Sequence, residues 1–597
     1  MPPAEPQYSV IHDGLEIDTR MLGGLPLIRA LIVKLGIDDV LNKLLPKDPR
    51  SRVSDTDCVV AMIANVLHGR CALYCMSEFF EHIDTAVLFG SDIDVSADAF
   101  NDNRLASCLD HLFEAGTDTV LADVVHQFLT APTETTPSYS VHADGTSLSL
   151  HGAYDREPVE GAPRPARGFS KDHRPDLKQL VYGMVLHGAT QVPLVAMTLD
   201  GNTSDKDLNR WSVVELASQL PEEHDVTIVA DSKMVDADVM GRLLDEGFHF
   251  VSLVPRTYSV RNDLVERART AGEVLPELAS VRGRRKTDPD LIYRGRSFHA
   301  DMKIVDPHTK EVEDREMTLL VVYSDAQALK FANSLDKKLV KEEAGFASAV
   351  KRVNRRGPRC LDDARVAMDD ALQRLKFQCC ELKIVAVEVK DKRTKRGRPK
   401  KGEKPPVHTE YHLEYDQLER DQDAIDKAAF HAAHFVLVTD RMDWDDKRIH
   451  AEYRHQSTIE GHSGFRWLKN EAVVAPIFLH TPHRIAALGL VFVLALMVRN
   501  YLQFEIRRRL AEEDQKLRGR KRNLYSRTAT PTAETVLLNF NGVTSILVSR
   551  EGVLLQRSAN PLTADALTVL ELLEVPVEVF TTPFDKWPKL DLKIPGM

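Results

Sequence analysis

Three acidic residues occupy settings in which a carboxylate can hold a metal ion. Asp144 interrupts a strand-like run, Asp231 ends a short apolar run, and Glu460 lies in a segment with helical patterning. Metal-dependent phosphoryl transfer uses such carboxylates to hold two divalent cations about 3.5–4 Å apart. Hard oxygen ligands suit Mg²⁺ for this work. The residue types and their order therefore predict a site for magnesium-dependent phosphoryl transfer on DNA.

Each of these residues also has an ordinary interpretation. An Ala-Asp-Gly sequence, as around Asp144, is most often a turn. Asp231 can cap the helix that follows it, and a glutamate on a helix is most often solvated. Against this, the extended pattern continues past Asp144, and Asp231 stands at the carboxyl end of a buried strand, where the sites of α/β proteins gather. We therefore expect the three residues to act together.

Helical periodicity gives Glu460 neighbours that can line a groove for DNA phosphates. At 100° per residue, a helix brings positions four and seven residues away from Glu460 onto its face. The residues on that face or flanking it are Tyr453, Arg454, Gln456, Arg466 and Trp467. We expect this stripe to contact DNA.

The elements that must position the carboxylates are expected in the order strand, strand, strand, helix, strand, helix, strand along the chain. The strands are expected at 139–150, 178–186, 191–199, 226–230 and 248–254, and the helices at 208–220 and 235–246. This order places the first and fourth strands side by side, which would bring Asp144 to Asp231. The predicted fold class is α/β, with a ribonuclease-H-like catalytic domain.

The chain is long enough for three to five domains at about 150 residues each. We predict an N-terminal helical domain (1–131), which is equally a packing domain or a DNA-end-binding module, and two parts of the catalytic core (132–259 and 443–510). Between those parts lies an inserted, strand-rich, basic domain (260–442), and a basic linker with a small α/β appendage (511–597) follows them. The apolar run 485–498 is too short to span a bilayer, so we expect a buried helix there.

A net charge of −11 argues against a wholly basic nucleic-acid binder. Positive charge is concentrated locally instead, and local patches can still neutralise phosphates. The basic clusters are 351–359, 390–404, 507–509 and 518–522. Within the second, Arg396 and Arg398 match the core of a minor-groove hook, although a basic loop with non-specific phosphate contacts is the favoured interpretation. We expect DNA as the partner, no membrane and a cytoplasmic location, since no secretory signal is apparent at the N-terminus.

Histidines and cysteines offer no clear ligand set by spacing alone. His450, His455 and His462 cluster near Glu460 but lack clean metal-ligand spacing, so surface or core histidines are favoured. The seven scattered cysteines are expected to be reduced thiols, and Cys71 and Cys75 have no second pair at zinc-finger spacing.

With these residues in place, the chain resembles a known family of enzymes. It is similar to the DDE transposases of bacterial and archaeal insertion sequences, in the superfamily of insertion sequence 4 and its 1634-type branch. The resembling stretches cover most of the chain. They are 101–105, 168–179, 201–205, 230–232, 476–478 and 484–485.

By that resemblance, Asp144, Asp231 and Glu460 would be the catalytic metal-binding triad, holding two Mg²⁺ ions for which Mn²⁺ can substitute. The family places an inserted domain before the glutamate and acts on terminal inverted repeats and target DNA, normally as at least a dimer. Its helix signature is Tyr, Arg, Glu and Lys; here Tyr453 and Glu460 match, whereas Gln456 replaces the Arg and Trp467 the Lys. The candidates to replace those cations are Arg454, Arg466 and Lys469, of which Lys469 lies on the opposite face of an unbroken helix.

Three other functions are compatible with the sequence. A metal-dependent nuclease without strand transfer would use the same carboxylates. A non-catalytic DNA-binding protein descended from a transposase would explain the altered Arg and Lys positions. A scaffold protein is favoured only by the acidic net charge.

Overall fold

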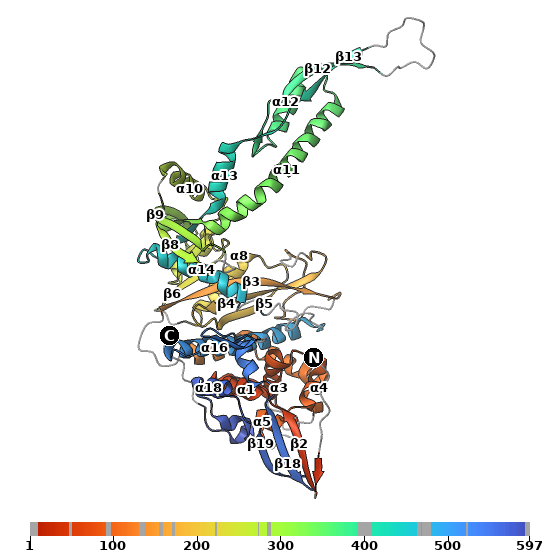
Figure 1. Ribbon diagram of the computed structural model, residues 1–597, viewed down its shortest axis with the longest axis vertical. Coiled ribbons are helices and arrows are strands. Elements are labelled where there is room, and N and C mark those ends of the chain that lie inside the picture. Colours follow the sequence, from red (N-terminus) through yellow and green to blue (C-terminus); the bar gives the residue numbers. More distant parts are fainter. Residues whose placement is uncertain are drawn as a thin grey trace, which may run out of the picture.

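The computed structural model is an elongated molecule with three regions along its length (Figure 1). A base contains helices from both ends of the chain, a large sheet lies in the middle, and an arm projects from the far side. The described residues are 10–12, 14–46, 51–90, 97–129, 138–154, 159–169, 174–220, 224–272, 274–282, 288–391, 407–462, 467, 479–520 and 523–590.

The middle region is built on a nine-stranded mixed sheet with the order β5-β4-β3-β6-β7-β15-β10-β9-β8. The strands are β3 (Ser138–Leu150), β4 (Lys178–His187), β5 (Pro193–Leu199), β6 (Asp225–Ala230), β7 (His249–Leu253), β8 (Glu277–Val281), β9 (Leu291–Val305), β10 (Val312–Ser324) and β15 (His434–Thr439). β6 runs parallel to both β3 and β7, and the other neighbours are antiparallel. The predicted hairpin of β4 and β5 is confirmed, as is the pairing of the first strand with the fourth.

Helices cover both faces of this sheet. They are α8 (Asp205–Ala217), α9 (Ala237–Asp245), α10 (Ser259–Ala271), α14 (Asp446–His462) and α16 (Pro482–Glu512). Figure 1 shows α8 and α16 on opposite sides of the β3–β4–β5 part. α16 is long and apolar enough to cross a membrane, but its apolar 18-residue window is entirely buried inside the protein, as in the core helix of a soluble protein. The prediction of a buried helix over 485–498 is confirmed.

The base joins the two ends of the chain in one sheet. Its helices are α1 (Leu25–Lys34), α2 (Ile37–Leu44), α3 (Asp55–Ala64), α4 (Met76–Glu81), α5 (Thr85–Phe89), α6 (Asp102–Glu114), α7 (Thr117–Leu129), α17 (Ala533–Leu537) and α18 (Ala564–Leu572). Its strands are β1 (Val10–His12), β2 (Leu15–Met21), β16 (Leu517–Arg520), β17 (Asn523–Thr528), β18 (Thr544–Arg550) and β19 (Val553–Ala559). β18 lies between β2 and β19, so the segment predicted as a C-terminal appendage shares a sheet with the N-terminal segment.

The arm differs from the predicted strand-rich insertion. β8, β9, β10 and β15 fall within 260–442 but belong to the central sheet. The arm itself is led by α11 (Asp325–Arg356), a 32-residue helix. Its other elements are α12 (Leu361–Leu372), α13 (Gln422–Ala433), β11 (Gln378–Cys379), β12 (Lys383–Lys390), β13 (Val407–Glu414) and β14 (Glu419–Arg420). α11 buries a narrow stripe of residues at helical spacing, which includes Phe331, Leu339, Phe346 and Val350, so the prediction of a strand-rich segment was wrong here.

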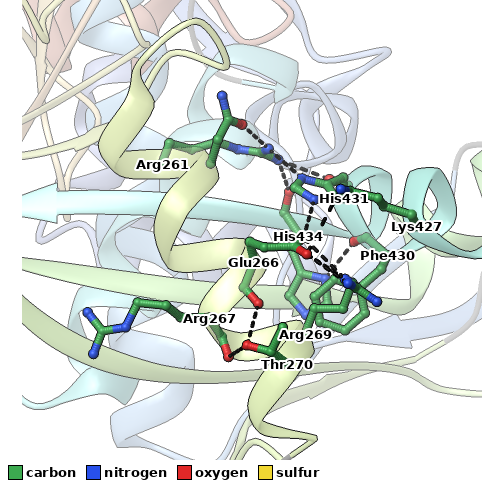
Figure 2. A network of polar contacts seen from close by, with 10 residues as sticks. Arg261, Glu266, Arg267, Arg269, Thr270, Lys427, Phe430, His431 and His434 are labelled. Atoms are coloured by element: carbon green, nitrogen blue, oxygen red, sulfur yellow. Dashed lines mark hydrogen bonds and ion pairs between the residues drawn. The ribbon is translucent and has the colours of Figure 1, made fainter.

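A polar network joins α10 to α13 and β15 at the root of the arm (Figure 2). Arg261 is buried and donates to the carbonyl oxygens of His431 and His434, at 2.9 and 2.8 Å. Glu266 lies 3.1 Å from Nε2 of His431 and forms an ion pair with Arg269. These contacts tie residues far apart in sequence and hold the strand that leads toward α14.

Candidate functional site

Asp231 lies at the end of a buried strand and is exposed. β6 is buried over most of its length because neighbouring strands and helices cover both faces, and Ala230 is its last residue. The Oδ1 atom of Asp231 accepts a hydrogen bond from the backbone N–H of Lys233 at 2.9 Å, and the Ser252 hydroxyl donates to the Asp231 carbonyl at 2.7 Å. The cap of α9 is Asp236. Asp231 is therefore not a helix cap, and its carboxylate is oriented by a local turn.

Asp144 lies inside a strand, which rules out the turn interpretation of Ala-Asp-Gly. β3 is continuous across it, and Asp144 pairs with Met184 of β4. In the parallel pairing with β6, the last matched residues are His142 and Val229. Two further positions along each chain, this register leads to Asp144 and Asp231. Neighbouring strands are about 4.8 Å apart. The two positions therefore lie on adjacent strands, near the carboxyl end of β6.

The opposite face of β3 is closed by α8. Gly145 pairs with Gly183 across the two strands, and a Cβ at either glycine would overlap a terminal methyl group of Leu208. Leu208 is 3% exposed. Only the absence of both side chains lets α8 approach the sheet this closely. Because successive strand residues alternate between faces, position 144 belongs to the other face, away from α8.

α14 crosses that other face. Ile449 is fully buried and packs, with the half-buried Tyr453, in a cluster that includes Val229 of β6 and Val251 of β7. Gln456 is 5% exposed. Positions 449, 453 and 456 form one helical stripe, and the same periodicity continues it to position 460. The side chains of Asp144 and Glu460 lie outside the described residues, whereas both backbones belong to described elements.

Sequence reasoning overlooked a polar cluster between β3 and α14. His142 is 3% exposed, and its ring centroid lies 5.5 Å from that of His455. Burial lowers the pKa of His142 to about 3, helped by His455 and His187, so the imidazole is neutral at physiological pH. Glu452 lies beside His455 on α14. The available signal was the Glu-x-x-His spacing, which places both side chains on one helix face.

The residues predicted to contact DNA fall into different environments. The Tyr453 ring is 6.3 Å from that of Phe435, so it packs against the sheet. The Arg454 guanidinium lies over the Tyr293 ring at 5.6 Å. Gln456 is buried, and its Oε1 atom has no hydrogen-bond partner among the described residues. Gln456 therefore presents no open face to a DNA backbone, whereas Tyr453 is half-buried.

Trp467 is also buried, at 8% exposed, and it contacts the base of the molecule. Its indole N–H donates to Oε1 of Glu534 at 3.0 Å, and the Arg499 guanidinium lies 5.1 Å from its ring centroid. The predicted role of Trp467 in a DNA groove does not agree with this burial, because α16 and the C-terminal segment cover the ring. Four further predicted DNA-contacting residues lie outside the described residues: Arg396, Arg398, Arg466 and Lys469.

Comparisons with known proteins bear on the base of the molecule. Residues 17–126 match the family model of a domain of unknown function, DUF4277, a range that runs from β2 into α7. No curated protein matches the chain. A solved structure that does match is the cryo-EM structure of the piggyBac transposase synaptic complex with hairpin DNA, at 14% identity and a TM-score of 0.23. The match covers 49% of this chain and 59% of that chain, which is less than two thirds of that protein's length. At this TM-score the likeness carries no argument about fold or function.

Proposed function

We propose that this protein is a DDE-type transposase that cleaves DNA at the ends of an insertion sequence and joins those ends to target DNA. The observation that carries the proposal is the parallel register of β3 on β6, which leads to Asp144 and Asp231 on adjacent strands. The crossing of α14 over the same face adds the helix on which Glu460 lies.

The strand order supports a ribonuclease-H-like core. Three antiparallel strands, β5, β4 and β3, are followed by the parallel strands β6 and β7, with helices on both faces. Ligand sites in α/β sheets lie at the carboxyl ends of strands. Asp231 stands at such an end.

The donor set fits divalent magnesium. Asp144, Asp231 and Glu460 would supply hard carboxylate oxygens, with Mn²⁺ as a substitute for Mg²⁺. Two bound ions would activate the attacking oxygen and stabilise the leaving oxygen of a phosphodiester. The protein's own contribution is positioning: the Lys233 N–H orients one oxygen of Asp231, and the apolar contacts of Ile449 and Tyr453 hold α14 on the sheet.

DNA from the element's ends and from the target would be the substrate, in the cytoplasm. Local positive charge would bind the phosphates, with the basic cluster 390–404 as one source. Holding two DNA ends together requires at least two active sites, so we propose a homodimer in the DNA complex.

A second candidate is a non-catalytic DNA-binding protein descended from a transposase. The burial of Gln456 and Trp467, at the positions where the resembling family has Arg and Lys, favours it. A DNA nuclease that cleaves without joining differs from both the transposase and the non-catalytic protein in its products, which are cleaved ends that never join target DNA.

The test is excision from a plasmid that carries the gene with its native flanking DNA. Asp231→Asn should abolish excision, because the variant loses a ligand charge while Asn can still accept the Lys233 N–H. DNA binding, measured in EDTA, should be unchanged. The matched control is Asp245→Asn, which removes one aspartate charge at the end of α9, away from the site.

Each outcome decides between the candidates. Excision by wild type and Asp245→Asn alone supports the transposase. Excision by Asp231→Asn removes this residue from the site. Cleaved ends that never join target DNA support the nuclease, and metal-independent DNA binding without any cleavage supports the non-catalytic protein.

A further inference from the structure

Three potential metal ligands converge from two elements outside the proposed carboxylate site. His142 comes from β3, and Glu452 and His455 come from α14. One ligand atom from each lies within 4.8 Å of the other two. The two imidazole rings meet nearly at right angles, with their planes at 85°.

His142 has unmet hydrogen-bonding capacity at this point. It is 3% exposed, and neither ring nitrogen has a hydrogen-bond partner among the described residues. Buried polar groups in native proteins are normally satisfied, so an exception calls for an explanation. A metal ion in the cluster would take the lone pair of one ring nitrogen and so supply a partner for that nitrogen.

We propose that His142, Glu452 and His455 form a binding site for a divalent first-row transition metal ion, with Zn²⁺ as the probe. Two imidazoles and one carboxylate are a common ligand set for Zn²⁺, with a fourth position left for water. Imidazole nitrogen selects for such metals over Mg²⁺. Tetrahedral geometry with bonds of about 2.0–2.1 Å needs ligand atoms roughly 3.3 Å apart. Side-chain movements on the order of 1 Å would achieve this spacing.

The cluster is distinct from the carboxylate site. His142 precedes Asp144 by two strand residues, or roughly 7 Å, and His455 precedes Glu460 by five helical residues, or about 7.5 Å. A metal ion here would link α14 directly to β3 and thereby restrain the turn of helix that leads to position 460. The proposed site is a positioning device, and it does not depend on the proposed transposase function.

The experiment uses the full chain, stripped of metal with a chelator and titrated with Zn²⁺ against a chromophoric competitor. Glu452→Gln and His455→Gln are the test variants, since both side chains are only half-buried. His431→Gln is the matched control because it breaks another histidine–glutamate pair, at 3.1 Å, at the root of the arm. Circular dichroism in chelator establishes that each variant is folded.

We expect wild type and His431→Gln to bind one Zn²⁺ per chain with the same affinity and a raised thermal midpoint. Each test variant should bind at least 10-fold more weakly, because it lacks one of three ligands. Asp231→Asn should bind Zn²⁺ as wild type does, which separates this site from the carboxylate site.

Several results would overturn the proposal. These are no Zn²⁺ binding by wild type at micromolar concentrations, unchanged affinity in a folded test variant, or loss of Zn²⁺ in Asp231→Asn. The Co²⁺ form of wild type provides a readout that needs no variant. An absorption band from thiolate ligation in that form would assign the bound ion to cysteines such as Cys71 and Cys75. It would therefore reject the proposed site.

Discussion

Gly145→Ala tests the packing of α8 against β3, on the face of the sheet opposite to α14. Leu208 of α8 sits against the paired glycines Gly145 and Gly183, and a Cβ at position 145 would overlap its Cδ2 methyl group. Intrinsic preference alone predicts the opposite result, since glycine inside a strand is about 0.5–1 kcal/mol less stable than alanine. Overpacking a closed interface costs roughly 1–3 kcal/mol. The clash should win, with a net loss of about 1–2 kcal/mol.

A double-mutant cycle isolates the clash. Leu208→Ala alone should cost about 2–5 kcal/mol, through lost contacts and the cavity left behind. In Gly145→Ala/Leu208→Ala, the new methyl group partly fills that cavity and no longer collides with leucine. The combined loss should therefore fall short of the sum by on the order of 1–2 kcal/mol, within the range of coupling between residues in contact.

Urea unfolding followed by tryptophan fluorescence measures these changes, and Trp211 provides a reporter because it borders the same glycine pair. Gly345→Ala is the control, and its expected effect on the free energy of unfolding is opposite in sign. Gly345 lies on an exposed turn of α11 with open space around it, so alanine should stabilise that helix by up to about 1 kcal/mol. A Gly145→Ala protein as stable as wild type, or strictly additive losses in the cycle, would refute the packing argument.

The other predictions concern the hydrogen bonds of a buried arginine and one ion pair. Arg261→Ala should destabilise the root of the arm by about 2–6 kcal/mol, since the carbonyl groups of His431 and His434 lose their donor at about 1–3 kcal/mol each; a loss below 1 kcal/mol in urea unfolding would contradict this. Burial would raise the pKa of Glu534, but the adjacent Arg499 outweighs it and lowers that pKa to about 2. The folded-state pKa is thus depressed, and this contact stabilises the protein above about pH 4.5 and is lost as pH falls toward 2. The stability gap between wild type and Glu534→Gln should narrow over that range, modestly because the Glu534 side chain is 37% exposed; a gap independent of pH would reject the ion pair.

Local patterns in the sequence predicted much of the middle region. The apolar run of β6, the hairpin of β4 and β5 and the buried helix α16 each show their own period or length, so no distant contact is needed to recognise them. Asp231 could be placed at a strand end for the same reason. The element order also predicted that the first and fourth strands lie side by side, whereas the register of that pairing came only from the structure.

Other features depend on residues far apart in the chain. β18 pairs with β2 although most of the chain separates them. β15 lies between β7 and β10 in the central sheet, although in the sequence it follows all the elements of the arm. No local period encodes such pairing, because it is decided by which apolar faces remain to be covered. α11 is a different case, because its buried residues Phe331, Leu339, Phe346 and Val350 do recur at helical spacing. The prediction of short strands over this segment was therefore wrong although a local helical pattern is present.

The candidate functional site can likewise be divided into what the sequence predicted and what only the structure decided. The sequence by itself predicted the three carboxylates, their order and the kinds of element that carry them, since these predictions rest on residue type and short-range periodicity. Only the tertiary structure decided that Gln456 and Trp467 are buried and that His142 meets Glu452 and His455. Burial and ligand convergence depend on which helix covers which strand, and that choice is made by packing across the whole core.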